Sequence, residues 1–232
     1  MKKLILLAIM AAVTAMMAIP AIASAGEWDI DSENEKLPLA FTSAGGAAQL
    51  KSGFGAITCT ANTGSGSYET KTTGTLTQTF TGCKDPFGGN CQSGATAGTI
   101  VTFVLPFHNI MLEATGSPAP YTNGTPGVLI TPNAVTGDFA TFTCNVIGAV
   151  TVKGNGLVGD ISNPGCGGAF QKTATLSFEE SAAGGNKQKW TQNTTAGTIY
   201  DLSSVTFAGT QTSAQVASGT VTYAQGTKIT CP

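Results

Sequence analysis

Polar and apolar residues alternate with a period of two along short stretches of this chain. The clearest case is residues 75–81 (TLTQTFT), where four threonines share one face of an extended strand and a leucine, a glutamine and a phenylalanine share the other. Such alternation is typical of an antiparallel strand with one buried face. Residues 205–207 and 221–223 show the same pattern over a shorter length.

Further short runs rich in β-branched and aromatic residues predict more strands. They cover residues 54–60, 99–105, 109–113, 128–131, 139–144, 147–152, 157–161, 174–178 and 228–231. Pro106 is expected to break or bulge its strand. Because no long 3.6-residue period appears after residue 25, the sequence predicts an all-β fold, either an antiparallel β-sandwich or a barrel-like domain with disulfides.

The first 25 residues have the pattern of a bacterial-type secretory signal peptide. Lys2 and Lys3 precede an apolar run over residues 4–19, and small residues at Ala23 and Ala25 form a cleavage site. We therefore expect cleavage after Ala25, secretion to the extracellular space or the cell surface, and no transmembrane segment in the mature chain. A retained membrane anchor is the alternative, but the apolar run is short for a bilayer span.

The mature residues 26–232 are enough for one large domain or two small ones. Residues 26–40 contain five acidic side chains and are expected to form a flexible N-terminal segment before a β-rich domain at 41–232. A turn-rich loop at residues 116–127 is the expected division if that domain has two lobes.

The mature chain has a low, negative charge. All 11 basic residues are lysines and two of them lie in the signal peptide, so nine positive charges face 13 negative ones and the net charge is −4. A nucleic-acid-binding protein needs a basic surface, usually with arginines. The composition therefore excludes that class of protein.

Six cysteines, all in the mature chain, predict three disulfides. Cys59, Cys144 and Cys231 each follow an apolar residue by two positions, which would direct them into the core. The other cysteines lie in turn-like sequence. We expect the pairs Cys83–Cys91, Cys144–Cys166 and Cys59–Cys231. No metal site is indicated, because the chain has no C-x-x-C and only one histidine.

Five short motifs occur in a fixed order along the chain. They are Phe80–Lys84 (FTGCK), Cys91, Ala97–Ile100 (AGTI), Pro126–Pro132 (PGVLITP) and Phe139–Cys144 (FATFTC), within roughly residues 57–180. In this order they resemble a group of secreted, cysteine-containing, β-rich proteins of actinobacteria. The resemblance implies export and β-structure. It carries over no site residue, since no biochemical function is assigned to that group.

The sequence does not indicate a catalytic centre. His108 is the only histidine, and no G-x-S-x-G motif supplies a nucleophile for it. Glu179 and Glu180 are adjacent, so on a strand they would point to opposite faces rather than into a common cleft, as a glycosidase needs. We therefore expect a protein that is not an enzyme and has no cofactor.

Two aromatic residues are the candidate ligand contacts. Trp190 lies in a polar loop and Tyr121 in the turn-rich loop, where an exposed ring would offer a platform for a sugar. The acidic residues 29–35 lack the glycine and glutamate of a calcium-binding EF-hand loop. The leading hypothesis is a secreted β-domain with a non-enzymatic surface or interaction role, whose partner is a cell-envelope component or a glycan. The alternatives are a glycan-binding module and an exported hydrolase using His108 or dispersed carboxylates.

Overall fold

The computed structural model describes residues 27–112, 125–163, 165–182, 184–187, 189, 202–206 and 209–231. Within these ranges the chain forms strands and no helix, which confirms the all-β prediction. The strands are β1 (Asp29–Ser32), β2 (Leu39–Ser52), β3 (Gly55–Cys59), β4 (Ala61–Tyr68), β5 (Thr73–Thr81), β6 (Cys91–Gln92), β7 (Ile100–Val101), β8 (Leu105–Leu112), β9 (Thr125–Ile130), β10 (Asp138–Cys144), β11 (Gly148–Gly154), β12 (Leu157–Ser162), β13 (Gln171–Phe178), β14 (Leu202–Thr206) and β15 (Gly209–Thr230). The predicted signal peptide lies outside the described residues.

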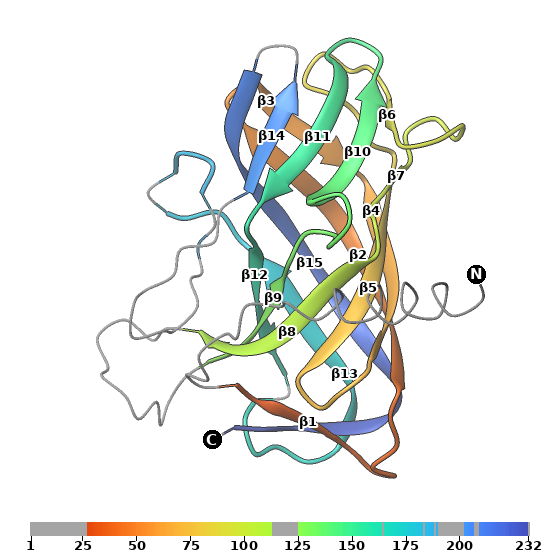
Figure 1. Cartoon of the computed structure of the whole chain (residues 1–232), viewed down its shortest axis with the longest axis vertical. Helices are drawn as coiled ribbons and strands as arrows, with labels where there is room; N and C mark the ends of the chain where they lie inside the picture. Colours follow the sequence, from red (N-terminus) through yellow and green to blue (C-terminus); the bar gives the residue numbers. More distant parts are fainter. Residues whose placement is uncertain are drawn as a thin grey trace, which may run out of the picture.

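Within the described part of the chain, eight strands form an antiparallel sheet that closes on itself (Figure 1). They pair in the order β2, β4, β5, β8, β9, β12, β13 and β15, and β15 then pairs with β2. This closure includes Ala217 opposite Ala48 and Tyr223 opposite Phe41. The closed sheet corresponds to the barrel-like form of the prediction.

The long strands β2 and β15 continue beyond this closed sheet and carry further strands at the upper end of the molecule (Figure 1). There β15 pairs with β14, which is followed by β11, β10 and β6, while β2 pairs with β3. Lys84 connects the two edges, because it bridges Thr58 of β3 and Asn90 next to β6. The upper end is therefore also closed around apolar side chains.

The six cysteines pair as Cys59–Cys83, Cys91–Cys144 and Cys166–Cys231. The predicted pairs Cys83–Cys91, Cys144–Cys166 and Cys59–Cys231 are all wrong. The register of the sheet explains the difference, because Cys91 lies opposite Cys144 in the β6–β10 pair and the bridge from Thr58 to Lys84 brings their neighbours Cys59 and Cys83 together. Three disulfides indicate an oxidising compartment, such as the outside of a cell.

The acidic N-terminal segment is not a flexible tail where the structure describes it. β1 pairs with the end of β15, with Ile30 opposite Ile229. Trp28 is fully buried and Ile30 is nearly so. The acidic residues alternate with these apolar ones, so the charges and the apolar side chains occupy opposite faces of the strand.

The expected division into two lobes near residues 116–127 is not present in the sheet. Residues 113–124 lie outside the described residues, and residues 125–127 belong to β9. β8 and β9, on either side of this loop, pair with each other from Phe107 opposite Ile130 to Leu112 opposite Thr125. Both strands therefore belong to one continuous sheet.

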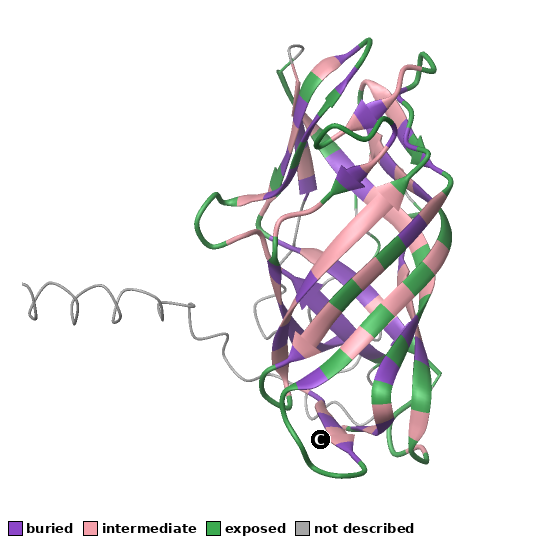
Figure 2. Cartoon of the chain, turned by 90° about the vertical axis from the view of Figure 1, so that its right-hand side faces the viewer, coloured by how far each residue is buried: buried purple, intermediate pink, exposed green. Residues whose placement is uncertain are grey.

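Inward and outward positions alternate along the strands as the sequence predicted, and Figure 2 shows the resulting bands of buried and exposed residues. In β5, Leu76 is buried and faces inward, whereas Thr77 and Thr79 face outward. Pro106 does not break its strand. It is the second residue of β8, where its carbonyl accepts the N–H of Thr131 at 2.9 Å. In the described residues no helix is long and apolar enough to cross a membrane.

Candidate ligand-binding cavity

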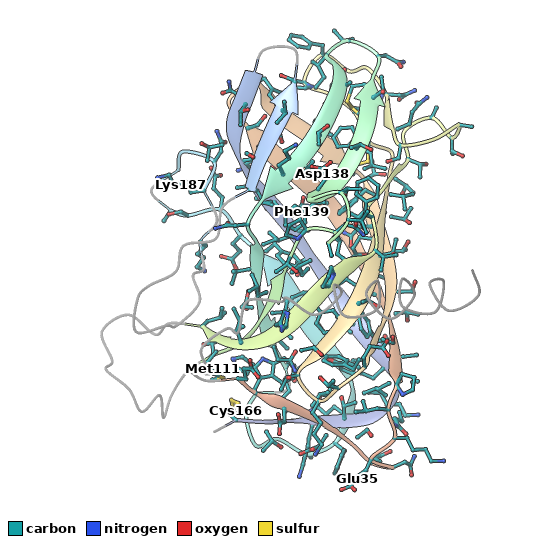
Figure 3. All side chains as sticks on the ribbon, viewed as in Figure 1. Glu35, Met111, Asp138, Phe139, Cys166 and Lys187 are labelled. Atoms are coloured by element: carbon teal, nitrogen blue, oxygen red, sulfur yellow. A yellow bond between two sulfur atoms is a disulfide. The ribbon has the colours of Figure 1, made fainter. Side chains whose placement is uncertain are left out.

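A cavity of about 100 Å³ lies where the closed sheet meets the strands of the upper end. Its lining comes from the closed sheet and from the strands of the upper end, and includes Leu50, Ile57, Phe139, Phe178 and Val221. Figure 3 places Phe139 near mid-height. One water molecule needs only about 10–15 Å³, and apolar cavities of about 150 Å³ bind benzene-sized molecules. The cavity is therefore large enough for more than a water molecule and has the lining that a small apolar molecule requires.

Four aromatic rings fill the interior of the closed sheet below the cavity. Three of the rings belong to Phe41, Phe107 and Tyr223. Each of these residues is two positions along its strand from a residue that lines the cavity, on the side toward the lower end. Tyr68 packs among them. The ring centroids are 4.8–6.5 Å apart, and several pairs meet edge to face, which is a favourable geometry. Burial raises the pKa of both tyrosines well above the ordinary value, so their hydroxyls stay protonated.

A buried polar network closes the lower end beneath these rings. Asn109 is fully buried, donates to the carbonyl oxygens of Trp28 (3.1 Å) and Lys71 (3.2 Å), and accepts from the Tyr68 hydroxyl (3.2 Å). The indole of Trp28 donates to the carbonyl of Gly127 at 2.8 Å. Because its polar atoms have partners, this network fixes β1 against the closed sheet without a desolvation penalty.

The upper end is held by the strap, defined here as residues Cys83–Cys91. Each end of the strap is a disulfide-bonded cysteine. Between them, buried Asp85 accepts the backbone N–H groups of Phe87 and Gly89, both at 2.9 Å, and that of Val146 at 3.3 Å. One carboxylate therefore organises the strap and ties it to the turn after β10.

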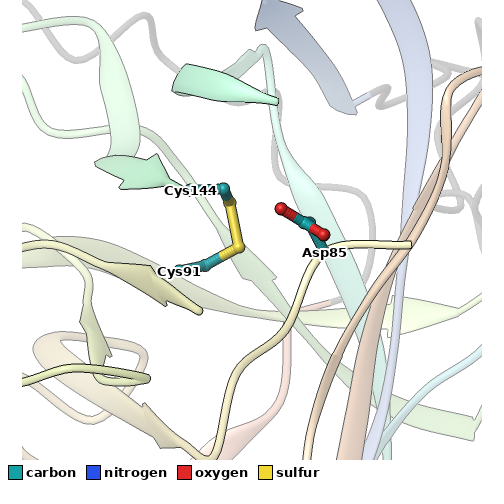
Figure 4. A group of neighbouring side chains, drawn as sticks. All are labelled: Asp85, Cys91 and Cys144. Carbon is teal, nitrogen blue, oxygen red and sulfur yellow. A yellow bond between two sulfur atoms is a disulfide. The ribbon is translucent and has the colours of Figure 1, made fainter. Parts of the chain in front are cut away.

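Asp85 also lies beside Cys91 and Cys144, close enough for the three side chains to resemble a metal-ligand set (Figure 4). The two sulfur atoms are bonded to each other, so neither is a thiolate that could bind a metal. The carboxylate oxygens already accept backbone N–H groups. The cluster is therefore a structural element of the strap.

The wall of the cavity contains a polar strip, defined as Ser43 of β2, Asn62 of β4 and Gln78 of β5. Ser43, Gly64 and Gln78 are direct neighbours across these three strands. Since Gly64 has no side chain, the Gln78 amide extends over it and accepts a hydrogen bond from the Ser43 hydroxyl at 3.3 Å. Asn62 lies one inward position further up and donates to the carbonyl of Gly46 at 3.0 Å.

Of the residues that the sequence singled out, His108, Glu179 and Glu180 do not line this cavity. Trp190 and Tyr121 lie outside the described residues. Glu179 pairs with Lys189 at 2.6 Å, whereas Glu180 pairs with Lys51 at 2.8 Å. The two adjacent carboxylates therefore bind different lysines and do not form a common acidic cleft.

His108 lies on the outer face of β8, since it alternates with Phe107 and Asn109, which face inward. It is 8% exposed, and its side chain has no hydrogen bond to any described residue. Burial lowers the pKa of His108 below its ordinary value, against a smaller opposing effect of Glu27. The described residues thus place no nucleophile or orienting acid in hydrogen-bond contact with the imidazole.

The acidic segment at residues 29–35 is engaged with the protein. Asp31 pairs with Lys71 at 2.7 Å and accepts a hydrogen bond from the Thr230 hydroxyl at 2.8 Å. The hydrogen bond from Lys71, supported by that from Thr230, lowers the pKa of this carboxyl. Asp31 therefore connects β1 to its neighbours.

Sequence analysis did not identify the cavity residues, because their pattern is the same as that of ordinary core residues. One signal was present, since Gln78 stands between Leu76 and Phe80 on the apolar face of its strand. A polar side chain among inward-facing apolar residues needs a partner inside the protein or a ligand. Comparison of the chain with protein-family models, curated proteins and solved structures finds no match, so the function has to be inferred from this geometry.

Proposed function

We propose that this protein is exported and acts outside the cytoplasm as a non-enzymatic binder of a small apolar molecule. The observation that carries the proposal is the cavity of about 100 Å³ between the closed sheet and the upper strands, which is lined mainly by aliphatic and aromatic side chains. A concave apolar site with a few polar groups is the usual form of a small-molecule site. Export is supported by the signal-peptide pattern, the three disulfides and the resemblance to secreted actinobacterial proteins.

The surroundings of the cavity favour binding over catalysis. Two disulfides fix the strap at the upper end, and the network around Asn109 fixes the lower end. A rigid apolar site of this kind binds without a large ordering cost. The described lining offers hydroxyl and amide groups but no paired base and nucleophile, which acyl transfer or hydrolysis would require.

The experiment is an isothermal titration of the oxidised mature chain with toluene, comparing two substitutions on β2. Ala48 faces the cavity and is 1% exposed, whereas Ala44 is exposed on the outer face of the same strand. We expect Ala48→Leu to weaken toluene binding at least tenfold because the added carbons occupy the cavity. Ala44→Leu should bind toluene like the wild type.

Two results would reject this proposal. One is the absence of toluene binding to the wild type, and the other is equal binding by Ala48→Leu and Ala44→Leu. If Ala48→Leu does not fold, Ala217→Val is a second substitution that fills the same cavity. Ala217 lies opposite Ala48 and also lines the space. Export is tested separately by N-terminal sequencing of the secreted protein, which should begin at Gly26.

A second candidate function, glycan binding, is favoured by a groove on the outer face of β4 and β5. The groove is lined by the hydroxyls of Ser65, Ser67, Thr75 and Thr77 beside Val104, which is 55% exposed. Hydroxyls next to an apolar side chain match the mixed polar and apolar faces of a neutral sugar. A neutral-glycan array with Thr77→Lys as the comparison tests this function, and equal signals for both proteins would count against it.

A further inference from the structure

The polar strip has hydrogen-bonding capacity that the protein does not use. The Gln78 amide accepts from Ser43, but its NH₂ group donates to no described residue. The Asn62 side chain donates to Gly46, but its carbonyl oxygen accepts from no described residue. The hydroxyl of Thr102, also in the lining, accepts the backbone N–H of Gln78 at 2.9 Å and keeps its own proton available. Donors and acceptors therefore remain open at one wall of a mostly apolar space.

The remaining wall carries no charge and is mostly apolar, with Gln215 of β15 as an inward-facing amide. Across the sheet order from the strip are residues of β9 and β13 such as Ile130 and Leu176, while Val221 of β15 lies beside Ser43. Among the described residues of the lining, none has a titratable side chain, since Cys59 is in a disulfide. A buried ion without a counter-charge costs several kcal/mol in an apolar site. An anionic or cationic ligand would therefore be strongly disfavoured.

We propose that the ligand of this cavity is an uncharged molecule with an apolar body and one hydrogen-bonding group, such as an alcohol, a ketone or an amide, and that Gln78 binds that group. This inference rests on the proposed binding function and adds the chemical class of the ligand. An amide side chain both donates and accepts, so Gln78 matches a hydroxyl or a carbonyl equally well. The apolar body then occupies the space beside Leu176 and Val221.

The test uses three probes of similar size: toluene, benzyl alcohol and benzoate. Isothermal titration at neutral pH compares the wild type with Gln78→Met, which keeps the length of the side chain and removes the amide. The matched control is Thr79→Val, on the outer face of the same strand and outside both candidate sites. A buried hydroxyl without a partner loses its hydrogen bonds to water and gains none in return. We therefore expect Gln78→Met to weaken benzyl alcohol binding about tenfold relative to toluene, and Thr79→Val to leave this ratio unchanged.

Benzoate should bind the wild type at least tenfold more weakly than benzyl alcohol, because its charge has no partner in the lining. The inference is overturned if Gln78→Met leaves the ratio of benzyl alcohol to toluene affinity unchanged, or if benzoate binds as well as benzyl alcohol. In either case, toluene binding to the wild type would still support the proposed binding function. If none of the three probes binds the wild type, the proposed function itself fails. Should Gln78→Met not fold, Thr102→Val removes a second polar group of the same wall.

Discussion

Gln78 lies directly across from Gly64 in the β4–β5 pair, and its amide occupies the space that a side chain at position 64 would fill. A methyl group at position 64 would overlap both the Gln78 amide and the Ser43 hydroxyl. We predict that Gly64→Ala lowers the free energy of unfolding by about 1–3 kcal/mol through overpacking. Urea denaturation measures this change.

Gly46→Ala is the control for this prediction, because nothing lies within 4 Å of the position where its β-carbon would be. A loss of stability for Gly46→Ala equal to that for Gly64→Ala would show that close packing beneath Gln78 is not the cause. Gly64→Ala should also weaken binding of benzyl alcohol more than binding of toluene, since the substitution displaces the amide.

The packing of the N-terminal segment leads to a second prediction about the free energy of unfolding. Trp28 is fully buried and donates to Gly127, so Trp28→Ala should lower the free energy of unfolding by about 3–5 kcal/mol. Lys36→Ala, at an exposed position of the same segment, should change it by less than about 0.5 kcal/mol. Equal midpoints for the two variants in thermal or urea unfolding would mean that residues 27–32 behave as a solvated tail.

The disulfide pairs predict a distinctive peptide map. Without reduction, trypsin should release residues 52–71 joined to 72–84, and residues 154–172 joined to 229–232. Residues 85–153 should appear as one peptide with an internal bond from Cys91 to Cys144. A peptide joining residues 72–84 to 85–153 would instead pair Cys83 with Cys91 or Cys144 and would contradict the observed bonds. Mass spectrometry before and after reduction distinguishes these results.

His108 predicts how stability depends on pH. Burial lowers its pKa in the folded state, so the unfolded chain binds a proton more readily than the folded one once the pH falls below the ordinary value of about 6.5. Stability should therefore decrease as the pH falls from 7 to 5. His108 is the only histidine, so His108→Leu should show a smaller decrease in urea midpoint over that interval. The same decrease in both proteins would exclude His108 as its source.

The sequence predicted strands where apolar and polar residues alternate and missed them where glycine occupies the inward positions. β5, β10 and β12 lie close to their predicted ranges. β4 (ANTGSGSY) is not among the predicted strands, and in the structure Gly64 and Gly66 face inward and make room for Gln78 and Phe41. The space that these glycines leave belongs to the neighbouring strands, so the residues of one strand could not reveal it.

The candidate site was less accessible to sequence analysis than the fold. The predicted contacts were chosen as exposed aromatic residues, whereas the cavity is built from inward-facing residues of many strands. The β2–β15 pair closes it by joining residues about 170 positions apart, such as Ala48 and Ala217. The disulfide prediction failed for the same reason, because proximity along the chain does not give the register of a closed sheet.

The most direct measurement of the central claim locates a bound molecule inside the sheet. Intermolecular nuclear Overhauser effects from toluene to methyl groups of the mature protein distinguish the interior from the surface. We predict contacts to Ile130 and Val221, which line the cavity. Contacts only to the exposed methyl groups of Val135 and Val146, or no contacts at saturating toluene, would contradict an internal binding site.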